Sequence, residues 1–227
     1  MDPTAIRARF AELLQRDDDD LPLAQLCYLI CQLAGYDVDV DAALADLDRS
    51  AQRLPRRFEG VLAGLFRGPA ALRGNTDDYY NVRNSMISEV QRTRLGLPIT
   101  LSVLAIEHGR RIGVPIEGIG LPGHFLVGAG DGITFGDPFH GGQILDRDEV
   151  EALYRRVTGQ RAWSDIFLEP VTARDILFRI LTNIRVASER RFADRPNLPW
   201  VFELLSWFPQ GPPFDPVMAA KSVAAFN

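Results

Sequence analysis

The side chains best suited to chemistry lie close together in the middle of the chain. His124 and His140 are two of only three histidines, and Asp137 lies between them, directly before a proline, in GLPGHFLVGAGDGITFGDPFHGG. An aspartate can accept a hydrogen bond from one imidazole nitrogen and leave the other nitrogen free to act as a base. The same three side chains could instead ligate a metal ion or fix a tight hairpin.

Short β-strand patterns around these residues predict how His124 and Asp137 are brought together. Residues rich in β-formers, separated by glycines, cover 115–121, 124–130, 132–137 and 141–146. We expect three or four antiparallel strands here, with a hairpin turn at GAGDGI, where the glycines can take positive φ. Pairing through that turn would make His124 and Asp137 cross-strand neighbours.

A buried helix is predicted just before these strands. In PITLSVLAIEHGRRIG, Pro98 has the position favoured for a first helical residue, apolar side chains occupy almost every face, and Gly113 ends the pattern. From Pro98 to Ile112 the helix would be about 22 Å long. Its N-terminus offers unpaired N–H groups and the positive end of the helix dipole. A nucleophile there would therefore gain an oxyanion hole.

Helical periodicity covers most of the remaining chain. It predicts helices over 4–16, 23–34, 40–53, 56–67, 86–94, 146–158, 172–193 and 197–209, with an acidic loop over 17–20. The fold class is therefore α+β. We expect a helical N-terminal region (1–75), a core with a central helix packed on a small antiparallel sheet (76–158), and a C-terminal helical hairpin (159–227), all in one compact unit.

The composition of the chain limits which kinds of partner and which cellular location we expect. The net charge of −5 and the lack of a basic run argue against nucleic acid as a partner. No apolar run reaches the length of roughly 18 residues that a membrane helix needs, and the first residues lack a signal-peptide pattern. Cys27 and Cys31 lie on one face of an apolar helix, where we expect two free core thiols. These features favour a reducing, cytoplasmic location.

Four sequence blocks resemble a known family. RNS, GLPITLSVL, PGHFLV and DPFHGG occur in the order and at the spacing of the bacterial SirB-type branch of the transglutaminase-like superfamily, over roughly residues 77–150. The resemblance implies a papain-like cysteine-enzyme fold, in which a nucleophile at a helix start is followed by a histidine and an aspartate. His124 and Asp137 match that histidine and aspartate. The branch often continues into a repeat-like helical pair, as 172–208 would be.

The chain departs from the catalytic members of that superfamily at the nucleophile. They carry cysteine at the start of the buried helix, whereas this chain has GLPITLS there. The matching position falls within 98–100, where Thr100 is the only hydroxyl. A threonine hydroxyl is a far weaker nucleophile than a thiol, so the sequence argues against cysteine-type acyl transfer.

The candidate site residues come from the same blocks. Thr100, His124 and Asp137 are the catalytic candidates. The candidate pocket residues are Asn84, Ser85, Ser102, Pro98, Phe125 and His140. Asn84 or Ser85 could equally cap the helix that follows them.

Three hypotheses remain open. The first is a non-catalytic regulatory protein whose partner is another protein. We expect the aromatic residues Trp200, Phe202 and Trp207 to pack in the core, although a partly exposed patch of them would suit a contact surface. The second is a hydrolase or acyltransferase acting on amide, peptide or thioester bonds, through Thr100 or through water activated by His124. The third and weakest is metal ligation by His124, Asp137 and His140, since we expect no cofactor and no metal.

Overall fold

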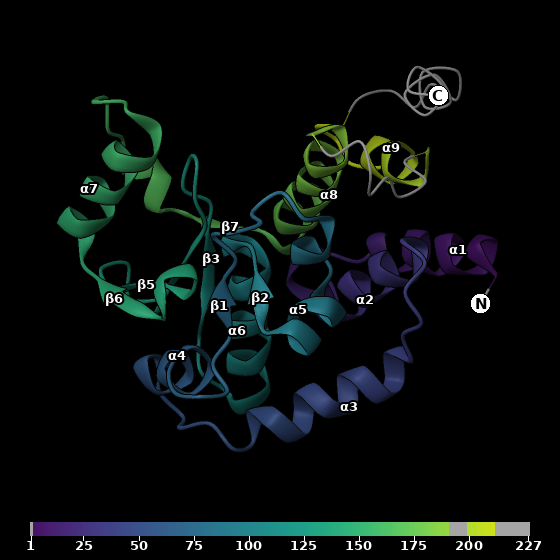
Figure 1. Cartoon of the computed structure of the whole chain (residues 1–227), viewed down its shortest axis with the longest axis horizontal. Helices are drawn as coiled ribbons and strands as arrows, with labels where there is room; N and C mark the ends of the chain where they lie inside the picture. Colours follow the sequence, from purple (N-terminus) through teal and green to yellow (C-terminus); the bar gives the residue numbers. More distant parts are fainter. Residues whose placement is uncertain (1, 191–198, 212–227) are drawn as a thin grey trace.

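A computed structural model describes residues 2–190 and 199–211, and the elements within them surround one central helix (Figure 1). The helices are α1 Pro3–Leu14, α2 Leu23–Leu33, α3 Val40–Ala51, α4 Phe58–Phe66, α5 Ile87–Thr93, α6 Pro98–Ile112, α7 Arg147–Thr158, α8 Ala173–Arg190 and α9 Pro199–Ser206. The strands are β1 Arg73–Gly74, β2 Leu95–Gly96, β3 Glu117–Ile119, β4 Leu126–Gly128, β5 Phe135–Asp137, β6 Gln143–Leu145 and β7 Pro170–Val171. This is the predicted α+β class.

Helix α6 is the element around which the others are packed. It runs from Pro98 to Ile112, as predicted, and ends at Gly113 in the left-handed conformation (φ 71°). Helices α2, α3, α4 and α5 and strands β3 and β4 all contact it. Side chains on nearly every face are buried, which matches the all-round apolar pattern of its sequence. Each large apolar side chain buried there contributes about 1.5–3 kcal/mol.

The sheet is antiparallel and lies between two apolar clusters. Its strand order is β6-β5-β4-β3-β7. Because neighbouring residues of a strand point to opposite faces, Val127 of β4 joins the main core with α6, whereas Leu126 packs in a second cluster beneath α7. The predicted hairpin is confirmed: β4 and β5 pair with Val127 opposite Gly136, and the Ala129 N–H donates to the Thr134 carbonyl at 3.0 Å.

Close packing at Gly136 fixes how the sheet lies on the N-terminal helices. A Cβ placed there would come within 2.3 Å of the Leu62 side chain on α4. Only glycine fits at this point of β5, which carries Asp137 as its next residue. The approach of α4 thus helps to set the position of Asp137.

The N- and C-terminal helices extend the same core. Residues of α1, α2, α8 and α9 belong to the cluster that contains α6, and Figure 1 shows these four helices together on one side of the molecule. Cys27 and Cys31 are free and buried in α2, as expected. In the described part of the chain no helix has the length and apolarity to cross a membrane.

The observed helices and strands differ in several places from those predicted from the sequence. Residues 17–20, expected to be a loop, include a short 3-10 helix over Asp18–Asp20. Strands β1, β2 and β7 were not predicted, because two-residue strands show no periodicity. His124 was expected on a strand but lies two residues before β4, so it is not paired opposite Asp137. Residues 191–193 and 197–198 of the two predicted C-terminal helices lie outside the described residues.

Candidate functional site

His124 and Asp137 form a buried pair. Nε2 of His124 lies 3.0 Å from both carboxylate oxygens of Asp137, and the two side chains are only 5% and 3% exposed. Because a carboxylate only accepts hydrogen bonds, Nε2 carries the proton and Nδ1 keeps its lone pair when the ring is neutral. Nδ1 has no hydrogen-bond partner among the described residues. The pair therefore has the orientation that a histidine base needs.

Asp137 also holds a second histidine. Nδ1 of His140 donates to Oδ2 of Asp137 at 2.7 Å, and Oδ1 accepts from the backbone N–H of Phe139 at 3.0 Å. Burial opposes ionisation, but the hydrogen bonds from His124 and His140 hold the pKa of Asp137 well below its usual value. The same carboxylate raises the pKa of His140. Asp137 is therefore anionic across the physiological pH range.

Local turns position both members of the pair. Asp137 ends β5 and caps the short 3-10 helix Pro138–His140, and its carboxylate lies within hydrogen-bond distance of both imidazoles. The His124 N–H donates to the Leu121 carbonyl at 3.0 Å, closing the turn that leads into β4. Arg179 of α8 donates to the carbonyls of His124 and Leu121, at 2.6 and 3.1 Å. The C-terminal helix thus fixes the backbone of the histidine.

A cavity of about 200 Å³ adjoins the His124 ring. Its lining residues come from four separate segments: Tyr79, Pro98, Ile99, Gly123, His124, Phe125, Arg179 and Asn183. Pro98, His124 and Phe125 were candidates from the sequence. Tyr79, Arg179 and Asn183 were not, since nothing in their local sequence shows that the loop at 79 and α8 reach this place.

Thr100 lies at the start of α6 with its hydroxyl turned to the backbone. Oγ1 accepts from the Leu97 N–H at 3.0 Å and lies 2.7 Å from the Asn84 carbonyl, to which it donates. The residue is 1% exposed and does not line the His124 cavity among the described residues. At the edge of that cavity α6 presents Pro98 and Ile99.

Comparison with known proteins decides the family. Residues 23–182 match the transglutaminase-like superfamily, which is well over half of the chain. The chain belongs to the transglutaminase-like superfamily. This match confirms the family that the four sequence blocks predicted.

Relatives of this transglutaminase-like protein occur in bacteria and in mammals. A UPF0162 protein of Xylella fastidiosa (strain 9a5c) is 37% identical over 185 residues, which are 74% of this chain and 65% of that protein. UPF0162 protein PA3419 of Pseudomonas aeruginosa is 25% identical over 63% of this chain and 56% of its own length. F-box only protein 21 of Mus musculus is 31% identical over 54% of this chain, but over only 20% of its own length. The chain thus spans about 65% or less of these curated relatives. No solved structure matches it.

Asn84 organises the transglutaminase-like site from outside the cavity. Its side-chain amide donates to the carbonyls of Asp78 and Tyr79, at 2.7 and 3.1 Å, and accepts from Asn75 at 2.9 Å. It therefore fixes the loop that brings Tyr79 to the cavity. The alternative that Asn84 or Ser85 caps α5 is wrong, because Met86 is the N-cap and no side chain caps this helix.

Ser85 and Ser102 are buried away from the His124 cavity. Their hydroxyl oxygens have no hydrogen-bond partner among the described residues, and neither residue lines the cavity. Both side chains are almost fully buried. The structure therefore does not bring these two candidates to His124.

His124, Asp137 and His140 satisfy the first geometric requirement of a metal site. One potential ligand atom from each lies within 4.8 Å of the others, and two imidazoles with one carboxylate is a donor set that suits zinc or iron. The hydrogen bonds among the three already account for their positions. Metal ligation therefore stays a hypothesis that needs metal analysis of protein purified without a histidine tag.

Proposed function

We propose that this transglutaminase-like protein is non-catalytic and acts as a regulatory protein that binds another protein. The observation that carries the proposal is the hydrogen bonding of the Thr100 hydroxyl. Thr100 is the one hydroxyl residue in the segment that matches the catalytic cysteine. Its oxygen is engaged with backbone groups of Leu97 and Asn84. Pro98 and Ile99, which do line the cavity, have no nucleophilic atom.

The other thiols of the chain do not replace the missing nucleophile. Cys27 and Cys31 lie in α2, and burial raises the pKa of both thiols. A thiol with a raised pKa is a poor nucleophile because the thiolate is the reactive form. His124 and Asp137, which match the histidine and aspartate of the catalytic family members, are therefore present without a nucleophilic side chain to activate.

Two exposed tyrosines beside the cavity support protein binding. Tyr79 and Tyr80 are 38% and 40% exposed, and their rings pack edge to face with centroids 5.3 Å apart. Tyrosine is enriched in protein interfaces, where its ring supplies apolar area and its hydroxyl supplies a hydrogen bond. The partner would thus contact the mouth of the His124 cavity.

A turnover screen tests the proposal. The protein and its His124→Gln variant would be assayed against peptide, amide and thioester substrates, with unfolding curves to check that both are folded. We expect no turnover above the uncatalysed rate in either protein. A turnover that the wild type shows and His124→Gln loses, while folding stays intact, would overturn the proposal.

A second candidate function is hydrolysis by water that His124 activates. It is favoured by the unpartnered Nδ1 and by the anionic Asp137, which would stabilise the imidazolium form. This candidate predicts turnover without a covalent intermediate, so intact-mass spectrometry during turnover would show no adduct. It also predicts that Asp137→Asn lowers kcat while Thr100→Val leaves kcat unchanged.

A further inference from the structure

A second and larger cavity lies on the far part of α6, away from His124. Its volume is about 540 Å³, against about 200 Å³ for the His124 cavity. It is open to solvent and is lined by residues of α3, α5 and α6, by Arg53 and Arg94 just beyond α3 and α5, and by Leu65 of α4 and Leu72. His108 of α6 lines this cavity. It lies ten residues after Pro98 and is therefore about 15 Å further along the helix axis. The two cavities share no lining residue.

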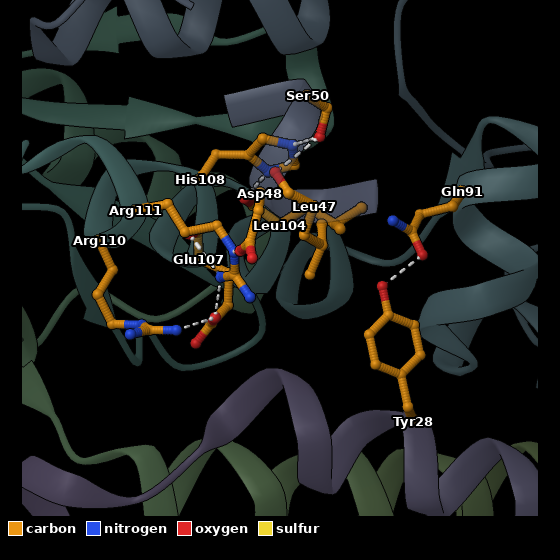
Figure 2. Close-up of polar contacts among 10 residues, drawn as sticks. All are labelled: Tyr28, Leu47, Asp48, Ser50, Gln91, Leu104, Glu107, His108, Arg110 and Arg111. Atoms are coloured by element: carbon orange, nitrogen blue, oxygen red, sulfur yellow. Dashed lines mark hydrogen bonds and ion pairs between the residues drawn. The ribbon is translucent and has the colours of Figure 1, made fainter. Parts of the chain in front are cut away.

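Hydrogen-bonded side chains form part of the cavity lining (Figure 2). Nδ1 of His108 lies 2.6 Å from the Leu104 carbonyl and Nε2 lies 2.8 Å from the Ser50 hydroxyl. A carbonyl only accepts, so Nδ1 donates to it, and Nε2 of the neutral ring is left as an acceptor. The Ser50 hydroxyl lies between this Nε2 and the Leu47 carbonyl, which is 3.0 Å away, and its single proton can serve only one of them. Burial lowers the pKa of His108, which keeps the ring neutral near pH 7.

Gln91 adds hydrogen-bond donors to this lining. Its Oε1 accepts from the Tyr28 hydroxyl at 2.8 Å, which leaves the two N–H groups of the amide for the cavity. Figure 2 shows the amide oxygen turned to the Tyr28 hydroxyl and the amide nitrogen turned away from it. A ligand would therefore meet amide donors from Gln91 inside the cavity.

The cavity lining is strongly cationic. Four arginines line it, Arg49, Arg53, Arg92 and Arg94, against the single acidic residue Asp46. The whole chain carries a net charge of −5, so the positive charge of this lining is opposite in sign to the net charge of the protein.

Not all of this charge is neutralised within the protein. Arg49 pairs with Asp46, and Arg92 pairs with Glu89 through two hydrogen bonds. Arg94 reaches the Ala70 carbonyl, which carries no charge. Arg53 has no side-chain partner in the described part of the chain. Arg53 and Arg94 thus remain as uncompensated cations beside the cavity.

We propose that this cavity binds a small phosphate-bearing anion. Guanidinium groups match the geometry of phosphate oxygens with paired N–H donors, and Gln91 adds further donors. His108 is the one aromatic ring that lines the cavity among the described residues, and it is only 4% exposed, so the lining offers little aromatic surface to a nucleobase. A phosphorylated small molecule is therefore a better match than a nucleotide. The inference does not depend on whether the His124 site is catalytic.

Calorimetric titration of the purified protein with pyrophosphate tests this inference. Ionic strength would be held constant with sodium chloride, and acetate would serve as a singly charged comparison. We expect saturable binding of one pyrophosphate and no measurable binding of acetate. Arg53→Gln should weaken pyrophosphate binding at least tenfold, since it removes an unpaired cation without disturbing a buried contact.

The matched control is Arg155→Gln on α7, whose arginine pairs with Glu151 on the surface and does not line the cavity. It should bind pyrophosphate as the wild type does. Because the chain has only three histidines, ring resonances give a second readout. Pyrophosphate should shift the resonances of His108 and leave those of His124 and His140 in place.

Three results would overturn the inference. One is the absence of saturable binding. Another is equal weakening by Arg53→Gln and Arg155→Gln, which would mean that only the overall charge matters. The last is a shift of the His124 or His140 resonances in place of His108, which would put the anion at the other cavity.

Discussion

Asp137 accepts hydrogen bonds from both histidines next to it. Its carboxylate accepts from Nε2 of His124 and from Nδ1 of His140, and its oxygens also cap the turn that carries His140. The two imidazoles differ in exposure, because the side chain of His140 is 46% exposed while that of His124 is almost fully buried. Solvent screening therefore limits what the His140 pair contributes to stability.

The pair between His140 and Asp137 should stabilise the protein mainly at acid pH. The folded pKa of His140 is raised above the unfolded value of 6.5, so its contribution is complete below that value and is lost as pH rises through the folded pKa. His140→Gln should thus lower the free energy of unfolding by less than about 1 kcal/mol at pH 5.5, and by less still at pH 9.

Urea unfolding of both proteins at several pH values measures this difference. Titrating groups that contact neither His140 nor Asp137, such as His108, act in both proteins and cancel in the comparison. A difference that stays constant or grows as pH rises would contradict the assignment of the charged pair.

At the scale of elements, the start of α6 shows what the sequence predicts and what it does not. The bounds of α6 followed from Pro98, the apolar pattern and Gly113, because these signals are local. The role of Thr100 did not follow, because its partner Asn84 is sixteen residues away. The same holds for Arg179, whose contact with the turn at His124 spans fifty-five residues.

Thr100 should matter for stability through its hydroxyl. Thr100→Val keeps the shape of the side chain but leaves the Leu97 N–H and the Asn84 carbonyl without this partner in a buried place. We expect a loss of about 1–3 kcal/mol in the free energy of unfolding. Thr100→Ser keeps the hydroxyl and serves as the control, with a loss of about 0.8 kcal/mol for the missing methyl group. Equal stability of Thr100→Val and wild type would show that the hydroxyl does not hold the start of α6.

At the scale of the whole molecule, distant segments meet to build the site. The loop at Tyr79, the start of α6, the approach to β4 and helix α8 all line the His124 cavity. The contact between His124 and Asp137 was predictable, since β4 and β5 form one hairpin whose turn glycines are evident in the sequence, but the position of His124 before β4 was not. The contributions of Tyr79 and α8 were not, because they depend on how the N- and C-terminal helices pack on the core. The predicted division into residues 1–75, 76–158 and 159–227 stays a prediction.

If the His124 and Asp137 site lacks only a nucleophile, as we propose, a thiol placed at Pro98 should become reactive. The rate of alkylation by iodoacetamide at pH 6 would be measured by intact-mass spectrometry for wild type, Pro98→Cys and Pro98→Cys with His124→Gln. Cys27 and Cys31 are buried with raised pKa values, so folded wild type should stay unlabelled.

We expect one rapid label on Pro98→Cys, because a helix N-terminus and a neighbouring imidazole lower the pKa of a thiol. His124→Gln should slow this labelling at least tenfold. Labelling of Pro98→Cys that is no faster than that of an ordinary cysteine, and that is unchanged by His124→Gln, would show that His124 is not placed to activate a nucleophile at the start of α6.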